Sequence, residues 1–203
     1  SFVLGLLERV EPNSVVILTS KQKNSDPFDR ELLKKYGAVV IRDRSKILLP
    51  TPRVTRKAKR IMRENQAKTI WFGAAAPLGF MASKLRNGGA TNIVALSHGH
   101  EVWWAKIPIL KQMMQKIIKD IDKLGYLGEF TKNEISKATT EVNKLVQIAP
   151  GIDTNHFQPK KPNPHLVSKY QLEGRRVIVC VARLVHRKGQ DQLIKALPDI
   201  LKK

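Results

Sequence analysis

Short apolar runs alternate with amphipathic segments along the first three quarters of the chain. The runs are rich in branched residues and do not alternate with polar ones, which is typical of strands buried on both faces. Between them, apolar residues recur at helical spacing. The runs expected to be strands cover residues 15–18, 38–41, 69–72, 92–96 and 145–148, and the segments expected to be helices cover 2–10, a stretch from about 26, 53–66, 107–124 and 131–140. The pattern predicts an α/β fold, with a parallel sheet covered by helices on both faces.

Proline and glycine residues that interrupt the pattern after residue 149 predict two domains of unequal size. Residues 1–149 are expected to form a Rossmann-like domain, and residues 150–175, which are rich in proline, an interdomain crossing. Residues 176–203 are then the incomplete start of a second domain, with a strand over 176–182 and a helix over 191–201. Cys180 is expected to be a small buried residue of that strand, and Pro198 to kink or divide the helix.

Charge is the most unusual property of the composition. The 203 residues include 37 Lys and Arg but only 17 Asp and Glu, for a formal net charge of +20. Such a field favours polyanionic partners, which are nucleic acids, anionic lipids and phosphorylated ligands. The single cysteine excludes an internal disulfide and fits a reducing compartment. No run of 18 apolar residues is present to span a membrane, and the start of the chain does not resemble a signal peptide.

The helix expected over 53–66 concentrates this charge around a narrow apolar stripe. Thr51 and Pro52 are expected to be its N-cap and first residue. One interpretation is a solvated polar face, and the other is a surface that binds an anionic membrane or another polyanion. Nucleic acid is the less favoured polyanion because aromatic residues for base stacking are absent from this segment. The residues of this predicted membrane or polyanion surface are Arg53, Arg56, Lys57, Lys59, Arg60 and Arg63.

A polar cluster, Ser97-His98-Gly99-His100-Glu101, directly follows the strand expected over 92–96. The carboxyl end of a parallel strand is where open α/β sheets bind ligands. Two imidazoles and a carboxylate there could carry out acid–base chemistry. Alternatively, these groups are ordinary hydrogen-bonded side chains at a strand end. The small-residue turn 73–77 either leaves helix N-terminal amides free for a ligand or only allows close packing.

Two motifs resemble the retaining glycosyltransferases of family 4. Residues 149–159, Ala-Pro-Gly-Ile-Asp-Thr-Asn-His-Phe-Gln-Pro, resemble the crossing between the two domains of that family. Residues 182–196, beginning Ala-Arg-Leu-Val-His-Arg-Lys-Gly-Gln-Asp, resemble the opening of its donor domain. The cluster 97–101 and the stretches 71–78 and 49–52 are most similar to the phosphatidylinositol mannosyltransferase branch. The resemblance covers nearly the whole chain.

The resemblance implies a two-domain GT-B hexosyltransferase that uses no metal ion and no cofactor. The donor substrate would be a nucleotide diphosphate sugar, GDP-mannose by analogy, and the acceptor a membrane-associated lipid such as phosphatidylinositol. Arg183 and Lys188 match the donor-binding cations, which would stabilise the departing diphosphate. His98 matches the catalytic histidine that orients the substrates and binds a sugar hydroxyl, and His100 and Glu101 are weaker acceptor-binding candidates. The resemblance places the protein in the cytoplasm, peripheral at the inner face of the membrane.

The chain also departs from that family at both ends. It is expected to start inside the helix that follows the family's first strand and glycine-rich loop, and to end before the family's two-glutamate motif. The isolated chain is therefore expected to be inactive or weakly active, and a homo-oligomer could cover the incomplete second domain. The alternative function is a non-catalytic Rossmann-like module that binds polyanions or anionic membranes.

Overall fold

The chain folds into two compact units, residues Ser1–Asp153 and Thr154–Lys203. The structure is a computed structural model, and it describes residues 2–99 and 102–202. The division between the units falls inside the expected interdomain crossing, and the three-part assignment of the chain remains a prediction.

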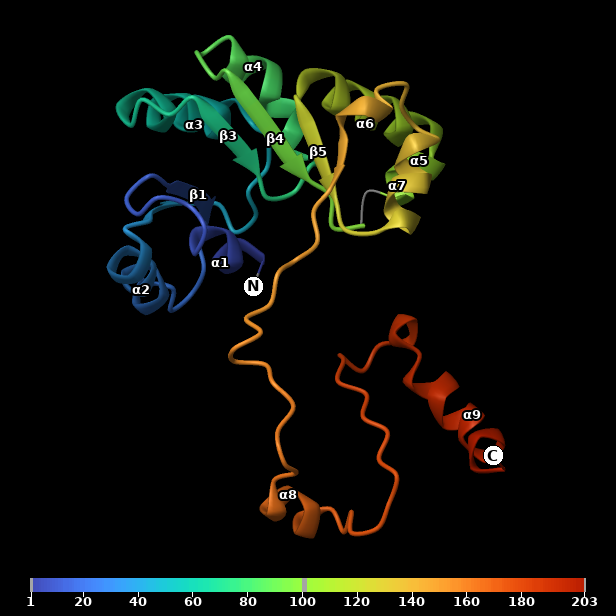
Figure 1. Ribbon diagram of the computed structural model, residues 1–203. Coiled ribbons are helices and arrows are strands. Elements are labelled where there is room, and N and C mark those ends of the chain that lie inside the picture. The colour runs from blue at the N-terminus through green and yellow to red at the C-terminus, as the bar shows by residue number, and fades with distance from the viewer. Residues whose placement is uncertain (1, 100–101, 203) are drawn as a thin grey trace. The chain divides into compact units, whose positions relative to one another are not determined.

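All six strands described in unit 1 are parallel, and they form two sheets (Figure 1). One sheet pairs β1 with β2, and the other has the order β3-β4-β5-β6. With helices on both faces, this arrangement confirms the predicted Rossmann-like α/β class. The strands are β1 Val16–Ser20, β2 Val39–Asp43, β3 Thr69–Phe72, β4 Asn92–Leu96, β5 Lys123–Tyr126 and β6 Leu145–Gln147.

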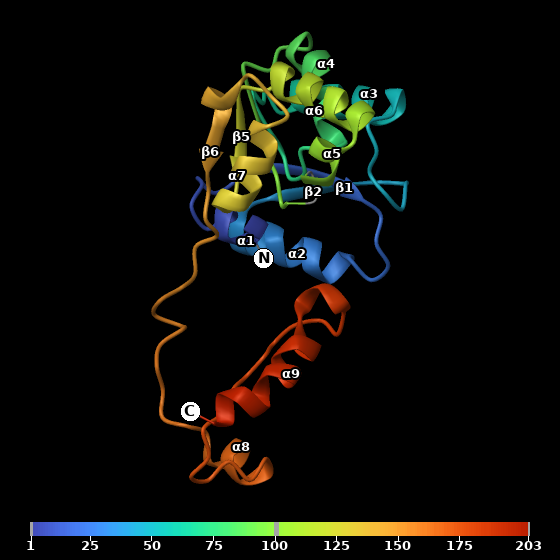
Figure 2. The same ribbon diagram turned by 90° about the vertical axis from the view of Figure 1, so that its right-hand side faces the viewer.

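Helices cover the strands of unit 1 on opposite sides. In Figure 2, α1 and α2 lie on one side of β1 and β2, and α3, α4 and α6 lie on the other. A small core joins Leu7 of α1 and Leu32 of α2 to Ala38. The helices and 3-10 turns of the unit are α1 Phe2–Leu7, α2 Asp26–Tyr36, α3 Pro52–Glu64, η1 Leu78–Met81, α4 Ala82–Arg86, α5 Val102–Lys106, α6 Pro108–Asp120, α7 Glu129–Ser136 and η2 Val142–Lys144.

The main core surrounds β4, which lies between β3 and β5. Ile93 of β4 is opposite Ile70 of β3, and Ala95 is opposite Leu124 of β5. Helix α6 covers these strands with the fully buried side chains Met114, Ile117 and Ile118. Gly79 of η1 lies against α6 so closely that a Cβ atom there would come within 2.4 Å of Ile117 Cγ2. This close packing of η1 against α6 leaves no room for a side chain at Gly79.

The sequence pattern concealed one strand. A helix was expected over 107–124, but α6 ends at Asp120 and β5 begins at Lys123. The apolar residues Ile117, Ile121 and Leu124 continue at helical spacing, so periodicity alone did not separate the four-residue strand from the helix. Ile121 adopts an extended conformation, φ −101° and ψ 163°, and ends the helix. The prediction was therefore wrong for residues 121–124.

Unit 2 contains α8 Pro164–Lys169, the 3-10 turn η3 His186–Lys188 and α9 Gln190–Leu201. Residues 176–182, which are all described, form no strand, and Cys180 is exposed instead of buried. A short apolar segment gains nothing from strand geometry when no neighbouring strand pairs with it. Helix α9 runs through Pro198, so the expected division of this helix is not observed.

Candidate functional site

The candidate site lies at the carboxyl ends of β3, β4 and β5, where two loops are bonded to each other and to β5. The loop after β3 is fastened to β4, because the Ala75 amide donates to the Leu96 carbonyl at 2.9 Å. The loop after β4 is fastened to β5, because the Ser97 amide donates to the Gly125 carbonyl at 2.8 Å. The sheet therefore positions the first residues of the predicted polar cluster.

His98 is exposed at this edge, and one of its ring nitrogens is held by the backbone. Its Nε2 lies 2.8 Å from the carbonyl oxygen of Gly73, the residue that follows β3. Since a carbonyl oxygen can only accept a hydrogen bond, Nε2 carries the proton in this contact. The neutral ring then has its proton on Nε2 and an acceptor at Nδ1. The imidazole is thus oriented across the ends of two neighbouring strands, as a group that positions a substrate requires.

The residues on either side of His98 support this orientation. Ser97 is fully buried, and its hydroxyl accepts a hydrogen bond from the Gly99 amide at 3.3 Å. Gly99 has φ of +86°, a left-handed conformation that favours glycine. An added Cβ there would be 3.6 Å from the Thr131 hydroxyl of α7, so this loop also approaches the next helix along the edge. The predicted acceptor-binding candidates His100 and Glu101 lie outside the described residues.

The basic helix α3 begins as predicted, with Thr51 as N-cap and Pro52 as first residue. The Thr51 hydroxyl accepts a hydrogen bond from the Val54 amide at 3.3 Å. The apolar stripe is buried through Val54, Ile61 and Met62. The helix therefore presents one face to the core and leaves the other for its charged side chains.

Two of the six predicted surface cations on α3 are turned inward instead, toward the buried Asp43 at the end of β2. Arg53 makes two hydrogen bonds to the Asp43 carboxylate, at 2.7 and 2.8 Å. Lys57 donates to the Arg42 carbonyl at 2.8 Å and lies 3.6 Å from the same carboxylate. The Ser45 amide and hydroxyl also donate to Asp43. The Arg53 hydrogen bonds, followed by those from Ser45, hold the pKa of Asp43 well below its usual range.

The remaining cations of α3 form a smaller basic surface than the sequence indicated. Arg56, Arg60 and Arg63 are exposed, at intervals of about one helical turn. Lys59 is half-buried, and its stem lies over Gly88, so that an added Cβ there would be 3.3 Å from Lys59 Cε. Arg60 also lies 3.6 Å from Glu64. We refer to Arg56, Arg60 and Arg63 as the arginine face.

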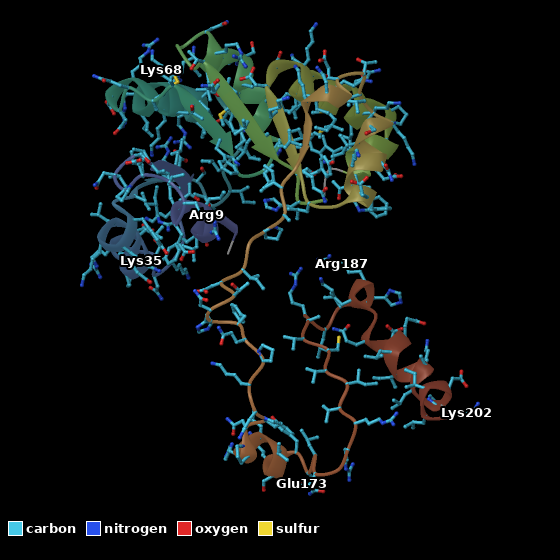
Figure 3. The ribbon with its side chains drawn as sticks, viewed as in Figure 1. Arg9, Lys35, Lys68, Glu173, Arg187 and Lys202 are labelled. Atoms are coloured by element: carbon cyan, nitrogen blue, oxygen red, sulfur yellow. The ribbon has the colours of Figure 1, made fainter. Side chains whose placement is uncertain are left out.

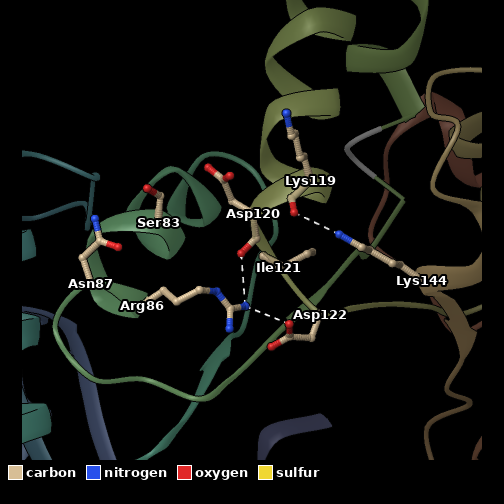
Figure 4. A pocket seen from close by; sticks show the side chains of 8 residues that line it. All are labelled: Ser83, Arg86, Asn87, Lys119, Asp120, Ile121, Asp122 and Lys144. Atoms are coloured by element: carbon tan, nitrogen blue, oxygen red, sulfur yellow. Dashed lines mark hydrogen bonds and ion pairs between the residues drawn. The ribbon is translucent and has the colours of Figure 1, made fainter.

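A second polar region lies at the opposite, amino end of β4 to β6, around an open cavity of about 330 Å³ (Figure 4). Arg86 donates to Asp122 at 2.8 Å, and the other carboxylate oxygen of Asp122 accepts from the Ile93 amide at 2.7 Å. Lys144 donates to two carbonyls at the end of α6, those of Ile118 and Lys119. Burial alone would raise the pKa of Asp122, but the bonds from Ile93 and Arg86 outweigh it and lower the pKa. These charges are used to join α4, α6 and β5, so we assign them a structural role.

The predicted donor-binding cations Arg183 and Lys188 lie in one exposed loop of unit 2, directly before α9. The Arg183 carbonyl accepts from the Val185 amide and from the Gln190 side chain, both at 2.9 Å. Gly189, with φ of 71°, ends the loop in a left-handed conformation and precedes the first turn of α9. Basic side chains are spread over both units, from Arg9 and Lys68 to Arg187 and Lys202 (Figure 3). The donor-binding roles of Arg183 and Lys188 remain predictions.

Sequence reasoning missed the two aspartates around which the polar clusters outside the candidate site form. One signal for the Asp43 cluster was present, because Asp43 and Ser45 have the spacing of a turn in which an aspartate accepts from the backbone two residues ahead. The Asp122 bond to Ile93 spans 29 residues and has no local sequence signal.

Along the described chain, none of the helices has both the length and the apolar character needed to cross a membrane. No protein-family model matches the chain. It is 36% identical over 194 residues to the GDP-mannose-dependent alpha-(1-6)-phosphatidylinositol monomannoside mannosyltransferase of Mycolicibacterium smegmatis, covering 95% of this chain and 50% of that protein.

Two further relatives give the same result. The protein of the same description from Mycobacterium tuberculosis is 34% identical over 198 residues, covering 97% of this chain and 51% of its own length. The GDP-mannose-dependent monoacylated alpha-(1-6)-phosphatidylinositol monomannoside mannosyltransferase of Corynebacterium glutamicum is 33% identical over 204 residues, covering 99% of this chain and 53% of its own length. The chain thus spans about half the length of the curated relatives it matches. The resemblance to phosphatidylinositol mannosyltransferases that the motifs indicated is therefore confirmed, and it extends over nearly the whole of this chain.

Proposed function

We propose that this chain provides the acceptor side of a mannosyltransferase that moves mannose from GDP-mannose to a phosphatidylinositol mannoside in an anionic membrane. The observation that carries the proposal is the identity of 33–36% to such enzymes along nearly the whole chain. The position of His98, at the carboxyl ends of parallel strands, supports it because open α/β sheets bind their ligands there.

In this proposal His98 binds a sugar hydroxyl and orients donor and acceptor. The bond between its Nε2 and the Gly73 carbonyl restricts the orientation of the ring, so less orientational freedom is lost when the substrate binds. Arg183 and Lys188 of unit 2 hold the donor diphosphate. As the bond between mannose and diphosphate breaks, negative charge grows on the diphosphate, and fixed cations stabilise it. Transfer proceeds with retention of configuration at the anomeric carbon.

A chimeric enzyme tests the proposal. Residues 1–203 would replace the corresponding half of the Mycolicibacterium smegmatis relative, and transfer of radiolabelled mannose from GDP-mannose into lipid would be measured in vesicles that contain phosphatidylinositol monomannoside. Activity that falls on replacement of His98 or Lys188 by alanine supports the assigned roles. Full activity in both variants contradicts them, and a folded chimera without activity contradicts the proposed reaction.

A second candidate is a non-catalytic module that binds anionic membranes through the arginine face. The three exposed arginines on α3 favour it, since each cation near an anionic leaflet contributes on the order of 1 kcal/mol to binding. Vesicle binding that falls steeply with salt, in a chimera that transfers no mannose, would select this candidate.

A further inference from the structure

An exposed apolar surface lies next to the candidate site, at the junction of α5 and α6. Trp103 is 69% exposed, Ile109 is 72% exposed and Ile107, between the two helices, is 47% exposed. Single exposed apolar residues are normal on protein surfaces, but a tryptophan and two isoleucines within seven positions form a concentration that requires an explanation. We refer to Trp103, Ile107 and Ile109 as the apolar tip.

The buried core does not include these side chains. Helix α6 packs inward through Met114, Ile117 and Ile118, which are fully buried. Ile109 belongs to the opposite stripe, with the exposed Gln112 and Lys116 three and seven residues later. On α5, Val102 is buried, whereas Trp103 faces outward. The apolar tip therefore lies outside the described hydrophobic core.

The surroundings of the apolar tip are basic. The segment from residue 102 to residue 116 contains three lysines and no acidic residue. Tryptophan and isoleucine beside lysines are typical of surfaces that enter the interface of an anionic bilayer, where the apolar side chains reach the acyl boundary and the cations remain at the headgroups. Protein–protein interfaces, by contrast, are depleted in lysine, so this surface fits a bilayer better than a second protein chain.

The apolar tip is also close to His98 along the chain. Trp103 is five positions after His98, so their Cα atoms are at most about 19 Å apart. Helix α5 starts directly beyond the strand-end loop, because the Val102 amide donates to the Gly99 carbonyl at 3.4 Å. A lipid whose headgroup reaches His98 therefore has its acyl chains within reach of the apolar tip.

We propose that Trp103, Ile107 and Ile109 insert into the interface of an anionic bilayer and hold the carboxyl edge of β4 at the membrane surface. This inference rests on the proposed function, which requires a lipid acceptor, and it adds an apolar anchor to the electrostatic contact of the arginine face. It predicts that part of the binding to vesicles survives at about 1 M salt, where the Debye length is only about 3 Å.

Fluorescence quenching tests the insertion directly. Residues 1–203 with Trp71→Phe and Trp104→Phe retain only Trp103, and vesicles of phosphatidylcholine and phosphatidylglycerol brominated at shallow acyl positions are added. We expect strong quenching of Trp103 and a shift of its emission to shorter wavelength. If Trp104→Phe prevents folding, the single variant W103F is compared with the unchanged chain, and it should lose the quenching. Binding without quenching of Trp103 overturns the insertion and leaves the proposed function intact.

Matched variants complete the test. W103S/I109S should weaken binding to these vesicles at high salt by about tenfold or more. Ile194→Ser is the control, because Ile194 on α9 is 70% exposed, close to the value for Ile109, and its loss should change nothing. An equal effect of the control overturns the proposal. So does a concentration-dependent dimer in sedimentation experiments that W103S/I109S abolishes, since the apolar tip would then bind a second copy of the chain. A folded chimera that inserts Trp103 into vesicles but transfers no mannose would contradict the proposed function and leave the insertion supported.

Discussion

The two ends of the sheet β3 to β6 both carry polar side chains, but they use them differently. At the amino end, Asp122 accepts bonds from Ile93 and Arg86, and Lys144 caps the last carbonyls of α6. There the charges are matched by partners within the protein. At the carboxyl end, an exposed imidazole is aligned by one backbone carbonyl, and the sheet itself supplies the support. The charged cluster and the cavity at the amino end of the sheet thus have a structural role, and the candidate site is the carboxyl end, which carries fewer charges.

The same contrast divides α3. Arg53 bonds to the buried Asp43 and Lys57 donates to the Arg42 carbonyl, so these two cations fix the helix to the end of β2. The arginine face points to solvent from the same helix. Charge counted along the sequence therefore overestimates the surface available to a polyanion, and only the outward cations should respond to a membrane.

The largest expected effect is on catalysis at the carboxyl end. In the chimera, H98A should lower mannose transfer by about 100-fold or more, which is typical for loss of a group that orients or exchanges a proton with the substrate. The unfolding temperature should change little, because the Gly73 carbonyl at this exposed position can bond to water. Transfer assays and thermal unfolding are measured together. A large fall in the unfolding temperature would show that His98 is a structural residue like Asp122.

The next effect concerns the two sets of cations on α3. R56Q/R60Q/R63Q should weaken binding to phosphatidylglycerol vesicles at low salt by about 100-fold, because each cation near an anionic leaflet contributes about 1 kcal/mol. R53Q/K57Q should lower the unfolding temperature and leave vesicle affinity nearly unchanged, because these side chains face Asp43. Vesicle co-sedimentation over a salt series measures both. The opposite pattern would mean that Arg53 and Lys57 leave Asp43 to meet the membrane.

A smaller effect is expected at the amino end. D122A removes the acceptor for the Ile93 amide and the partner of Arg86. It should destabilise the fold by about 1 kcal/mol, which is the low end of the cost of an unsatisfied buried group, because the carboxylate is partly exposed. Mannose transfer in the chimera should not change beyond this loss of stability. Asp120→Ala is the control, since its backbone carbonyl still accepts from Arg86. Impaired transfer in a stable D122A variant would assign this end a function.

The parts of this molecule that were predictable from sequence are those with local signals. The N-cap at Thr51, the buried strand over 92–96 and the polar cluster after it depend on neighbours in the chain. The strand β5 and the bonds from His98 to Gly73 and from Arg53 to Asp43 depend on contacts made only after folding. The prediction of a strand over 176–182 was wrong because, although its apolar pattern is suitable, no described strand pairs with it. Local pattern predicts that an element can form, and tertiary pairing decides whether it does.

The smallest expected effect is the pH dependence of the amino end. Because hydrogen bonds from Ile93 and Arg86 hold the pKa of Asp122 below its usual value despite burial, the folded state binds its proton less readily than the unfolded chain does. The stabilisation by Asp122 is therefore complete above the unfolded pKa of about 3.9, and it is lost as the pH falls from there through the folded pKa. Thermal unfolding of the unchanged chain and of D122A from neutral pH downward should show a difference of a few degrees that narrows below about pH 4. If the difference in unfolding temperature instead stays constant into strong acid, the neutral carboxyl of Asp122 stabilises the fold as well as the carboxylate does. The charge of Asp122 would then not be what stabilises the amino end of the sheet.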